Sequence, residues 1–415
     1  MSLKVDQVYR YSQVSSLRRH GTTSRLLLST SGGTVDFPYF FQGSLRQPRM
    51  AGMLLRSLMT IVQSRFFVPP NMLARILALA DPVVTCHKDR LRFEGFSGCC
   101  GVYARVDLLP EAIDGDFCGF GTSNVDSNPP MIHALTRLRD RDSVELSVGE
   151  DEVRLKTGES SVVEKKVKLP IRWIKGFVET QAVLSRMELR HELSAVDANR
   201  FLRSLPRMST HRRSTWIVPS GRSIRLSQRE ARGAVRVGGL ERLRVLEPLC
   251  PEAKSLRIYG DTTTSASAWE LDLGDCRFQL ALSPEVWRGF SGEGQVLEDL
   301  AASGRDRLLA RVKAELNWAW TVDRVRLAQR IGCDEKQINQ ALSVLGTRGL
   351  VGFDLHENSW FHREFPFDLT IVEKLQPRLV DARKLVDEGA VRDAPAERGE
   401  SDFSSQAVTS TIAFV

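Results

Sequence analysis

The sequence lacks the patterns by which several functional classes are recognised. No apolar run is long enough to cross a bilayer, and residues 1–6 are not followed by the apolar segment of a secretory signal. The seven histidines contain no H-x-x-x-H pair or other metal spacing, and no nucleophile elbow occurs. We therefore expect a cytoplasmic, non-enzymatic protein with no membrane contact and no cofactor.

Cysteine is scarce and scattered. The seven cysteines are odd in number, and the adjacent pair Cys99 and Cys100 does not have the C-x-x-C spacing of a zinc ligand pair. We expect reduced, buried thiols and no metal site. The glycine-rich run 95–101 is not followed by Lys-Ser/Thr or by a helix start, so it predicts a tight turn or bulge and not a phosphate-binding loop.

What the chain does have is an ordinary globular composition, with 42% apolar and 26% charged residues over 415 positions. This length suggests several domains. The net charge of +7 favours a polyanionic partner, although solubility alone would explain so small a surplus.

The positive charge is concentrated in one segment. Residues 186–244 contain fourteen arginines and no lysine against five acidic residues, a net charge of +9. The guanidinium group of arginine can donate two parallel hydrogen bonds to the oxygens of one phosphate. These side chains are therefore candidates for contact with a nucleic-acid backbone. Alternatively, they solvate exposed strands or pair with an acidic protein. The candidate phosphate contacts are Arg203, Arg207, Arg212, Arg213, Arg222 and Arg225.

Residues 321–365 carry the clearest function-related pattern. A first helix is expected at about 308–320, and Val325, Ala328 and Ile331 then place one apolar stripe on a second helix that Gly332 ends. Asp334 and Gln337 form a capping-box signature for a third helix. The runs 350–355 and 360–365 flank a polar turn, which indicates a β-hairpin. Together these elements predict a winged helix-turn-helix.

The third helix of this module would bury Ile338, Ala341, Leu342 and Leu345 and expose hydrogen-bonding side chains. Gln and Asn suit adenine edges and Lys suits guanine in the major groove. A protein-docking role is the open alternative, because charges in 305–365 are nearly balanced, with ten Lys or Arg against eight Asp or Glu. The candidate groove contacts are Lys336, Gln337, Asn339, Gln340, Ser343 and Arg348.

The remaining pattern predicts an α+β fold. Helices are expected at 48–65, 71–80, 131–138 and 196–205, and alternating apolar residues predict strands that include 102–108 and 276–282. The predicted divisions are an N-terminal α+β domain at 1–128, an arginine-rich α+β region at 129–295, the winged module at 296–368, a helix at 369–390 and a disordered tail at 391–415.

Parts of the sequence resemble two known families. The run VELSVGEDEVRL at 144–155, within a helix and three short strands, resembles a strand pair of the DNA polymerase processivity clamps. The resemblance implies clamp-like modules of helix plus antiparallel sheet, followed here by the winged helix-turn-helix. It does not imply that a ring forms.

The sequences HREFPFD at 362–368 and VEKLQPRLVDAR at 372–383 resemble the segment before the zinc finger of bacterial SWIM zinc-finger proteins, and CGVYAR at 100–105 and NVDSNPP at 124–130 are similar to that family as well. The family implies nucleic-acid or protein binding, with AAA+ ATPase and von Willebrand factor A proteins as partners. No cysteine follows Cys333, so the zinc finger itself is absent from this sequence.

The leading hypothesis is a DNA-binding protein in which the arginine-rich strands hold phosphates while the third helix and the wing enter a groove of the duplex. It requires both surfaces to lie on one side of the molecule. The alternative is an interaction scaffold in a multi-protein assembly. Neither the oligomeric state nor a sequence specificity follows from the residues.

Overall fold

The computed structural model describes residues 16–20, 23–27, 39–66, 81–126, 128–167, 169, 171–206, 215–221, 223–287, 289–290, 306–365, 384, 391–393 and 412–414. Every strand pair in these ranges is antiparallel. Because helices are interspersed with these strands, the fold is mixed α+β. No helix among the described residues has the length and apolarity needed to cross a membrane.

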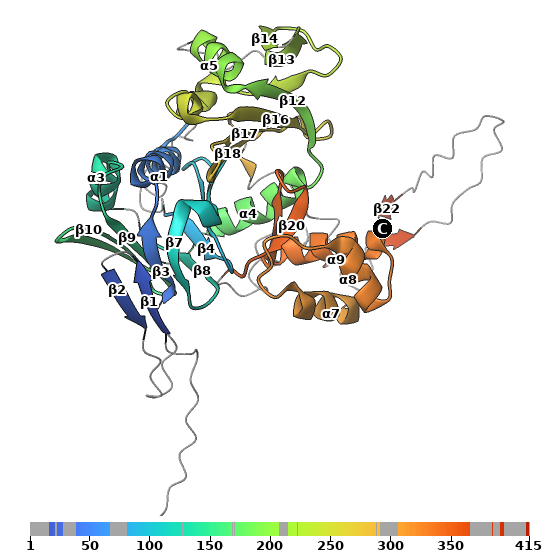
Figure 1. Cartoon of the computed structure of the whole chain (residues 1–415). Coiled ribbons are helices and arrows are strands. Elements are labelled where there is room, and N and C mark those ends of the chain that lie inside the picture. The colour runs from blue at the N-terminus through green and yellow to red at the C-terminus, as the bar shows by residue number, and fades with distance from the viewer. Residues whose placement is uncertain are drawn as a thin grey trace, which may run out of the picture.

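An eight-stranded sheet lies at the centre of the molecule (Figure 1). Its strands come from distant parts of the chain, so it joins the first half to the second. In sheet order they are β12 (Glu188–Ser194), β16 (Ser255–Gly260), β17 (Ser267–Asp272), β18 (Cys276–Leu282), β6 (Val102–Leu108), β5 (Leu91–Phe96), β4 (Val83–Cys86) and β8 (Gly121–Asn124).

The two faces of this sheet differ in polarity, because side chains alternate along each strand. Phe93 lies opposite Val106 on one face, and the parity of the β17 register places Trp269 on the same face. Arg92 lies opposite Asp107 on the other face. One face is therefore apolar and the other charged.

Helices cover the apolar face. They are α1 (Pro48–Gln63), which packs on β5 and β6, and α5 (Ala195–Ser204), where Phe201 stacks on Trp269 with ring centroids 6.1 Å apart. A third helix, α3 (Pro129–Arg137), packs beside α1. Gly52 permits this approach, because a Cβ there would lie 2.6 Å from the Leu135 carbonyl oxygen. We call α1, α3 and α5 the helical layer.

Smaller sheets flank the central one. A five-stranded sheet has the order β11 (Ser160–Lys165), β10 (Glu152–Thr157), β9 (Val144–Gly149), β3 (Tyr39–Leu45) and β7 (Ile113–Phe117). A three-stranded sheet beside α5 has the order β14 (Ser223–Ser227), β13 (Thr215–Ser220) and β15 (Val235–Val237). Two further pairs are β1 (Ser16–His20) with β2 (Thr23–Leu27) and β21 (Val391–Asp393) with β22 (Ile412–Phe414). Short 3-10 turns are η2 (Pro110–Ala112), η3 (Leu240–Leu246) and η4 (Cys250–Glu252).

The charged face is covered by α4 (Ile171–Leu184) and by a compact unit from the C-terminal half. That unit consists of α7 (Asp306–Leu316), α8 (Arg324–Ile331), α9 (Glu335–Thr347), β19 (Val351–Asp354) and β20 (Ser359–His362). We call it the helix–hairpin unit (orange in Figure 1). It packs against α4 through α9 and β19.

Several sequence-based expectations match these elements, and others do not. The expected strands 102–108 and 276–282 coincide with β6 and β18. The expected domain boundary at residue 128 does not coincide with a boundary between sheets. The central sheet and the five-stranded sheet each contain strands from before and after this residue. β7, β8 and α4 have no counterpart among the elements expected from the sequence.

Three further differences concern single elements. Val325 was expected on the buried stripe of α8, but it is 50% exposed, and Leu327, Ala328 and Ile331 form the buried side. The expected disordered tail 391–415 contributes the paired strands β21 and β22. The helix expected at 71–80 lies outside the described residues, as does nearly all of the one expected at 369–390.

Candidate nucleic-acid interface

Helix α9 forms where its end signals predict. The Asp334 side chain accepts a hydrogen bond from the Gln337 backbone N–H at 2.7 Å, and the Asp334 backbone N–H donates to the Gln337 side chain at 3.2 Å. This reciprocal capping satisfies backbone donors that the first helical turn leaves without partners. Before it, Gly332 ends α8 with a left-handed φ of 74°.

The side chains of α9 expected to contact a groove differ in accessibility. Lys336 and Gln340 are exposed, and Gln337, Asn339, Ser343 and Arg348 are half-buried. Some are already engaged within the protein. Gln337 belongs to the capping box, Asn339 accepts a hydrogen bond from the Arg324 guanidinium at 3.1 Å, and Gln340, Ser343 and Arg348 also have interaction partners.

The second half of α9 is buried on more sides than its apolar stripe requires. The expected core positions Ile338, Ala341, Leu342 and Leu345 are buried, and so are Val344, Gly346 and Thr347. Helices α4 and α7 both pack against α9. Only the first two turns of α9 therefore present an accessible polar surface.

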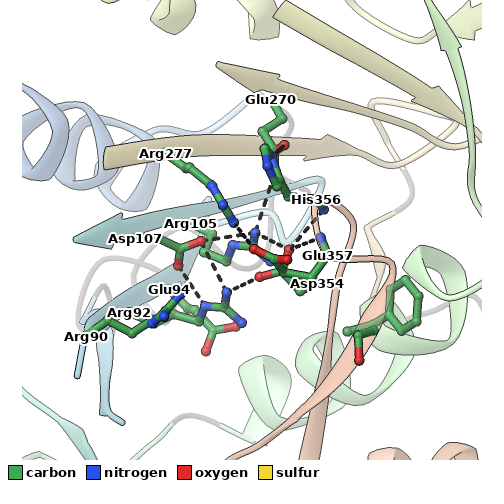
Figure 2. A network of polar contacts seen from close by, with 12 residues as sticks. Arg90, Arg92, Glu94, Arg105, Asp107, Glu270, Arg277, Asp354, His356 and Glu357 are labelled. Atoms are coloured by element: carbon green, nitrogen blue, oxygen red, sulfur yellow. Dashed lines mark hydrogen bonds and ion pairs between the residues drawn. The ribbon is translucent and has the colours of Figure 1, made fainter. Parts of the chain in front are cut away.

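The hairpin of the helix–hairpin unit is docked on the charged face of the central sheet (Figure 2). Asp354, at the end of β19, accepts hydrogen bonds from Arg92 and, at 3.2 Å, from Arg105. Arg92 also holds Asp107, with its Nε 2.7 Å from one carboxylate oxygen. None of these side chains is more than 1% exposed.

The hairpin turn adds further charged contacts around this centre. His356 Nδ1 lies 2.8 Å from the Glu270 carboxylate, and Arg277 donates to Glu357 at 2.7 Å. Beyond β20, Arg363 donates to the buried Glu94 at 2.6 Å. Charged groups of the hairpin turn thus pair with charged groups of the sheet face (Figure 2).

Two buried carboxyl groups of this network, those of Asp354 and Glu94, have a lowered pKa and stay ionised. Burial alone would raise the pKa of Asp354, but the guanidinium groups of Arg105 and Arg92 hold the pKa well below its usual value. Burial would likewise raise the pKa of Glu94, and Arg363, Arg92 and the Tyr103 hydroxyl lower it. The network is therefore a set of fixed opposite charges and not a pair of catalytic groups with separated pKa values.

This docking corrects one expectation from the sequence. The hairpin was expected to approach a nucleic-acid groove, but Asp354, Ser359 and Phe361 are buried, and its turn is bonded to β16, β17 and β18. In this structure the hairpin attaches the helix–hairpin unit to the sheet.

The arginine-rich segment is divided between structural and exposed roles. Arg242 is fully buried, and its Nη1 donates to the Gly101 carbonyl at 2.8 Å. Arg236 pairs with Glu285. Of the candidate phosphate contacts, Arg203 on α5 and Arg225 on β14 are exposed, and Arg207, Arg212, Arg213 and Arg222 lie outside the described residues.

Arg203 and Arg225, the two candidate arginines within the described residues, do not share one side with the third helix, contrary to expectation. Arg203 lies on α5, which packs on the apolar face of the central sheet, whereas α9 lies with the unit on the charged face. Figure 1 shows α5 and β14 at the top, with β12, β16 and β17 between them and α9.

A different set of exposed arginines lies on the helical layer. Exposed arginines lie on the helical layer and at the ends of its helices, and among the described residues their guanidinium groups form no ion pair and no hydrogen bond. The set is Arg56 and Arg65 with α1, Arg137, Arg139 and Arg141 with α3, and Arg203 with α5.

Arg49 connects the three helices of this layer. Its Nε lies 3.1 Å from Asp140 after α3, and its Nη2 lies 3.1 Å from Glu252 of η4, which packs against α5. On α5, Asp197 pairs with Arg200 at 3.2 Å and accepts a hydrogen bond from the capping residue Ser194. Asp140, Glu252 and Asp197 are thus paired with arginines, whereas Asp142 accepts a hydrogen bond from the Arg139 backbone N–H.

Sequence reasoning missed most of this set, although two signals were present. Arg56 lies on the polar side of an expected amphipathic helix, and residues 137–141 place three arginines in five positions. What the sequence does not show is that α1 packs beside α3 and that Arg49 joins α1 to η4, which packs against α5.

The comparisons with known proteins show no family. No family model matches the chain, and no curated protein matches it. Among solved structures, the proliferating cellular nuclear antigen of Entamoeba histolytica matches with a TM-score of 0.39 and 11% sequence identity, covering 60% of this chain and 99% of that chain.

Proposed function

We propose that this protein binds nucleic acid non-enzymatically, through contacts between the helical layer and the phosphate backbone. The observation that supports this function best is the group of exposed, unpaired arginines shared by α1, α3 and α5. Arginine binds phosphate oxygens with two parallel N–H donors. Because such contacts address the backbone and not the bases, we expect binding with little sequence preference.

Double-stranded DNA is the form we propose for this ligand. The arginines are spread over three neighbouring helices instead of converging in one pocket, as suits a long, regularly charged polymer. A duplex also releases condensed counterions from each phosphate that a cation neutralises. An acidic protein would require carboxylates at matching positions, whereas a duplex presents phosphates all along its surface.

The helix–hairpin unit has the element order of a winged helix-turn-helix, and we propose it as a second, weaker contact. Lys336 and Gln340 on the accessible turns of α9 are its candidate groove contacts. Asp334 and Glu335 begin the same helix and would repel phosphates. We therefore expect these two turns to contribute less than the helical layer.

The test is duplex binding over a salt series. A labelled duplex of about 20 base pairs is titrated with the full chain and with a triple variant, Arg56→Ala, Arg137→Ala and Arg203→Ala. A plot of log affinity against log salt concentration has a negative slope, and each lost phosphate contact makes it shallower by about 0.9. We expect the slope for the triple variant to be shallower by about 2.7, and its affinity for the duplex at low salt to be weaker than that of the parent.

A matched control removes the same charge elsewhere. Arg154→Ala, Lys156→Ala and Lys165→Ala remove cations of β10 and β11 that are already paired with carboxylates. This control should keep the parental slope. Equal losses in both triple variants, or no loss in the first, would contradict the proposal.

A protein-interaction scaffold is the second candidate, favoured by a cavity of about 210 Å³ between α7 and α8. Leu316, Val322 and Leu327 contribute its apolar surface, and Arg326 and Arg330 line it as well. AAA+ ATPase or von Willebrand factor A partners remain a proposal from the SWIM resemblance. A pull-down that recovers stable partners after nuclease treatment, and loses them on Leu327→Glu, would support it.

A further inference from the structure

A group of aromatic rings lies where the helix–hairpin unit meets the central sheet. Phe120 comes from the turn before β8, and Trp318 and Trp320 come from the segment between α7 and α8. The pairing of Cys86 with Gly121 places Phe120 beside the turn that joins β4 to β5. We call Phe120, Trp318, Trp320 and the neighbouring Lys88 and Arg90 the aromatic seam.

The rings are stacked and partly accessible. Trp318 stacks on Phe120, with centroids 6.4 Å apart, and on His362, with centroids 4.7 Å apart. Trp318 is half-buried, and Phe120 is 39% exposed, which makes it one of the few large apolar side chains that the described residues leave open. An exposed ring on a stacked group offers a flat apolar surface to another planar ring.

The backbone holds Trp318 in an unusual conformation. Asn317 has a φ of 42° and Trp318 a φ of 51°, so two successive residues other than glycine lie in the left-handed region. For a bulky side chain this conformation is an outlier that its surroundings must stabilise. Here the Trp318 backbone N–H donates to His362 Nδ1 at 2.7 Å, which holds the indole ring on the stack.

Positive charge adjoins the rings. Lys88 is exposed and forms no ion pair within the described part of the chain. The guanidinium of Arg90 lies 4.4 Å from the Trp320 ring centroid and pairs with Asp89 at 2.7 Å. Stacking rings next to cations are the pattern by which proteins bind single-stranded nucleic acid.

We infer that the aromatic seam binds an unpaired nucleobase, with Phe120 stacking on the base and Lys88 contacting an adjacent phosphate. Bases within a duplex already stack on each other, so the ligand is a single strand. Every base has a flat face, so the contact tolerates any sequence. The inference does not rest on the proposed function. Arg92, on the charged face of the sheet, lies 4.0 Å from the Trp320 ring, so the seam and the helical layer lie on opposite faces.

The experiment compares two single-stranded probes of equal charge. One is a labelled oligothymidylate of about twelve nucleotides, and the other is an abasic oligomer of the same length. Fluorescence anisotropy is measured for the full chain and for Phe120→Ala and Phe120→Tyr. We expect Phe120→Ala to weaken oligothymidylate binding about tenfold and to leave abasic binding unchanged. Phe120→Tyr retains a ring and should bind like the parent.

The triple variant of Arg56, Arg137 and Arg203 separates this inference from the proposed function. Because it alters only backbone contacts, it should retain the preference for oligothymidylate over the abasic probe, whatever happens to duplex binding. Unchanged oligothymidylate binding by Phe120→Ala would overturn the inference, as would an equal loss for both probes. Binding of a labelled proline-rich peptide that Phe120→Ala abolishes, with oligothymidylate unaffected, would overturn it in favour of a peptide site.

Discussion

Asp354 illustrates how single residues fix the helix–hairpin unit. Its carboxylate is wholly buried and bonded to arginines from β5 and β6. A pair of buried opposite charges adds little net stability compared with apolar residues of similar size, but removing one partner leaves the other charge buried without compensation. Removing one member of the network should therefore lower the free energy of unfolding by more than the whole ion pair contributes to it.

We predict that Asp354→Ala lowers the free energy of unfolding by about 3–5 kcal/mol at neutral pH. The folded-state pKa of Asp354 is depressed, so its contribution is present at neutral pH and is lost only as the pH falls below about 4. Urea denaturation measures the change. Glu357→Ala is the control, because its pair with Arg277 is partly exposed and should cost about 0–1 kcal/mol. Similar losses in both variants would argue against this account.

His87 gives a prediction for a higher pH range. Burial, and after it the charge of Arg92, holds the pKa of His87 well below about 6.5. The unfolded chain therefore binds more protons than the folded chain below about pH 6.5, and stability declines with acidification. The His87 ring packs edge-on against the Trp320 and Phe361 rings. A phenylalanine ring at position 87 can make the same aromatic contacts without a titratable group.

We predict that His87→Phe reduces the difference in urea midpoint between about pH 7.5 and pH 5.5. Part of the difference remains, because burial also lowers the pKa of His362. His133→Gln serves as the control, since His133 is exposed on α3 and should leave the pH dependence unchanged. If His87→Phe behaved like that control, His87 would not be a source of acid sensitivity.

At the scale of elements, α9 combines two roles along its length. Its first turns are capped and accessible, and its last turns are packed between α7 and α4. Gln337 shows the resulting competition. Its side chain accepts a hydrogen bond from the Asp334 N–H, and a contact with a base would have to replace that bond.

We predict that Asp334→Ala costs about 1 kcal/mol of stability through loss of the helix cap. Removal of an acidic group near Lys336 should leave duplex affinity unchanged or slightly raised. Thermal denaturation and the salt-series assay measure the two effects separately. A variant of unchanged stability would mean that the capping box does not hold the start of α9.

The sequence predicted elements better than their arrangement. Short-range signals were sufficient for β6, β18 and the start of α9, because alternation and capping act within a few residues. Helix α4 was missed because its apolar residues are interrupted by Gly176 and follow directly on a strand pattern. β7 and β8 were missed because their Gly, Asp and Asn residues are typical of turns.

At the scale of the whole molecule, the sequence did not predict which elements cover each face of the central sheet. Alternation along β5 places Arg92 and Glu94 on one side of the strand, and such a pattern ordinarily means that this side meets solvent. Here a unit encoded about 260 residues later covers it, with Asp354 and Arg363 as partners. No local pattern shows that a distant hairpin supplies the countercharges. For the same reason, the sequence did not separate the arginines near α5 from α9.

The opposite character of the two faces limits what the chain tolerates. Side chains repeat every second residue along a strand, so deleting one residue within β5 would turn Arg92 and Glu94 toward α1 and Phe93 toward the hairpin. Packing on both faces of the sheet would then be disrupted. The apolar face would contain buried charges, and the charged face would lose its ion pairs with the hairpin. Length changes within β5 and β6 should therefore be far more damaging than most substitutions on the same strands.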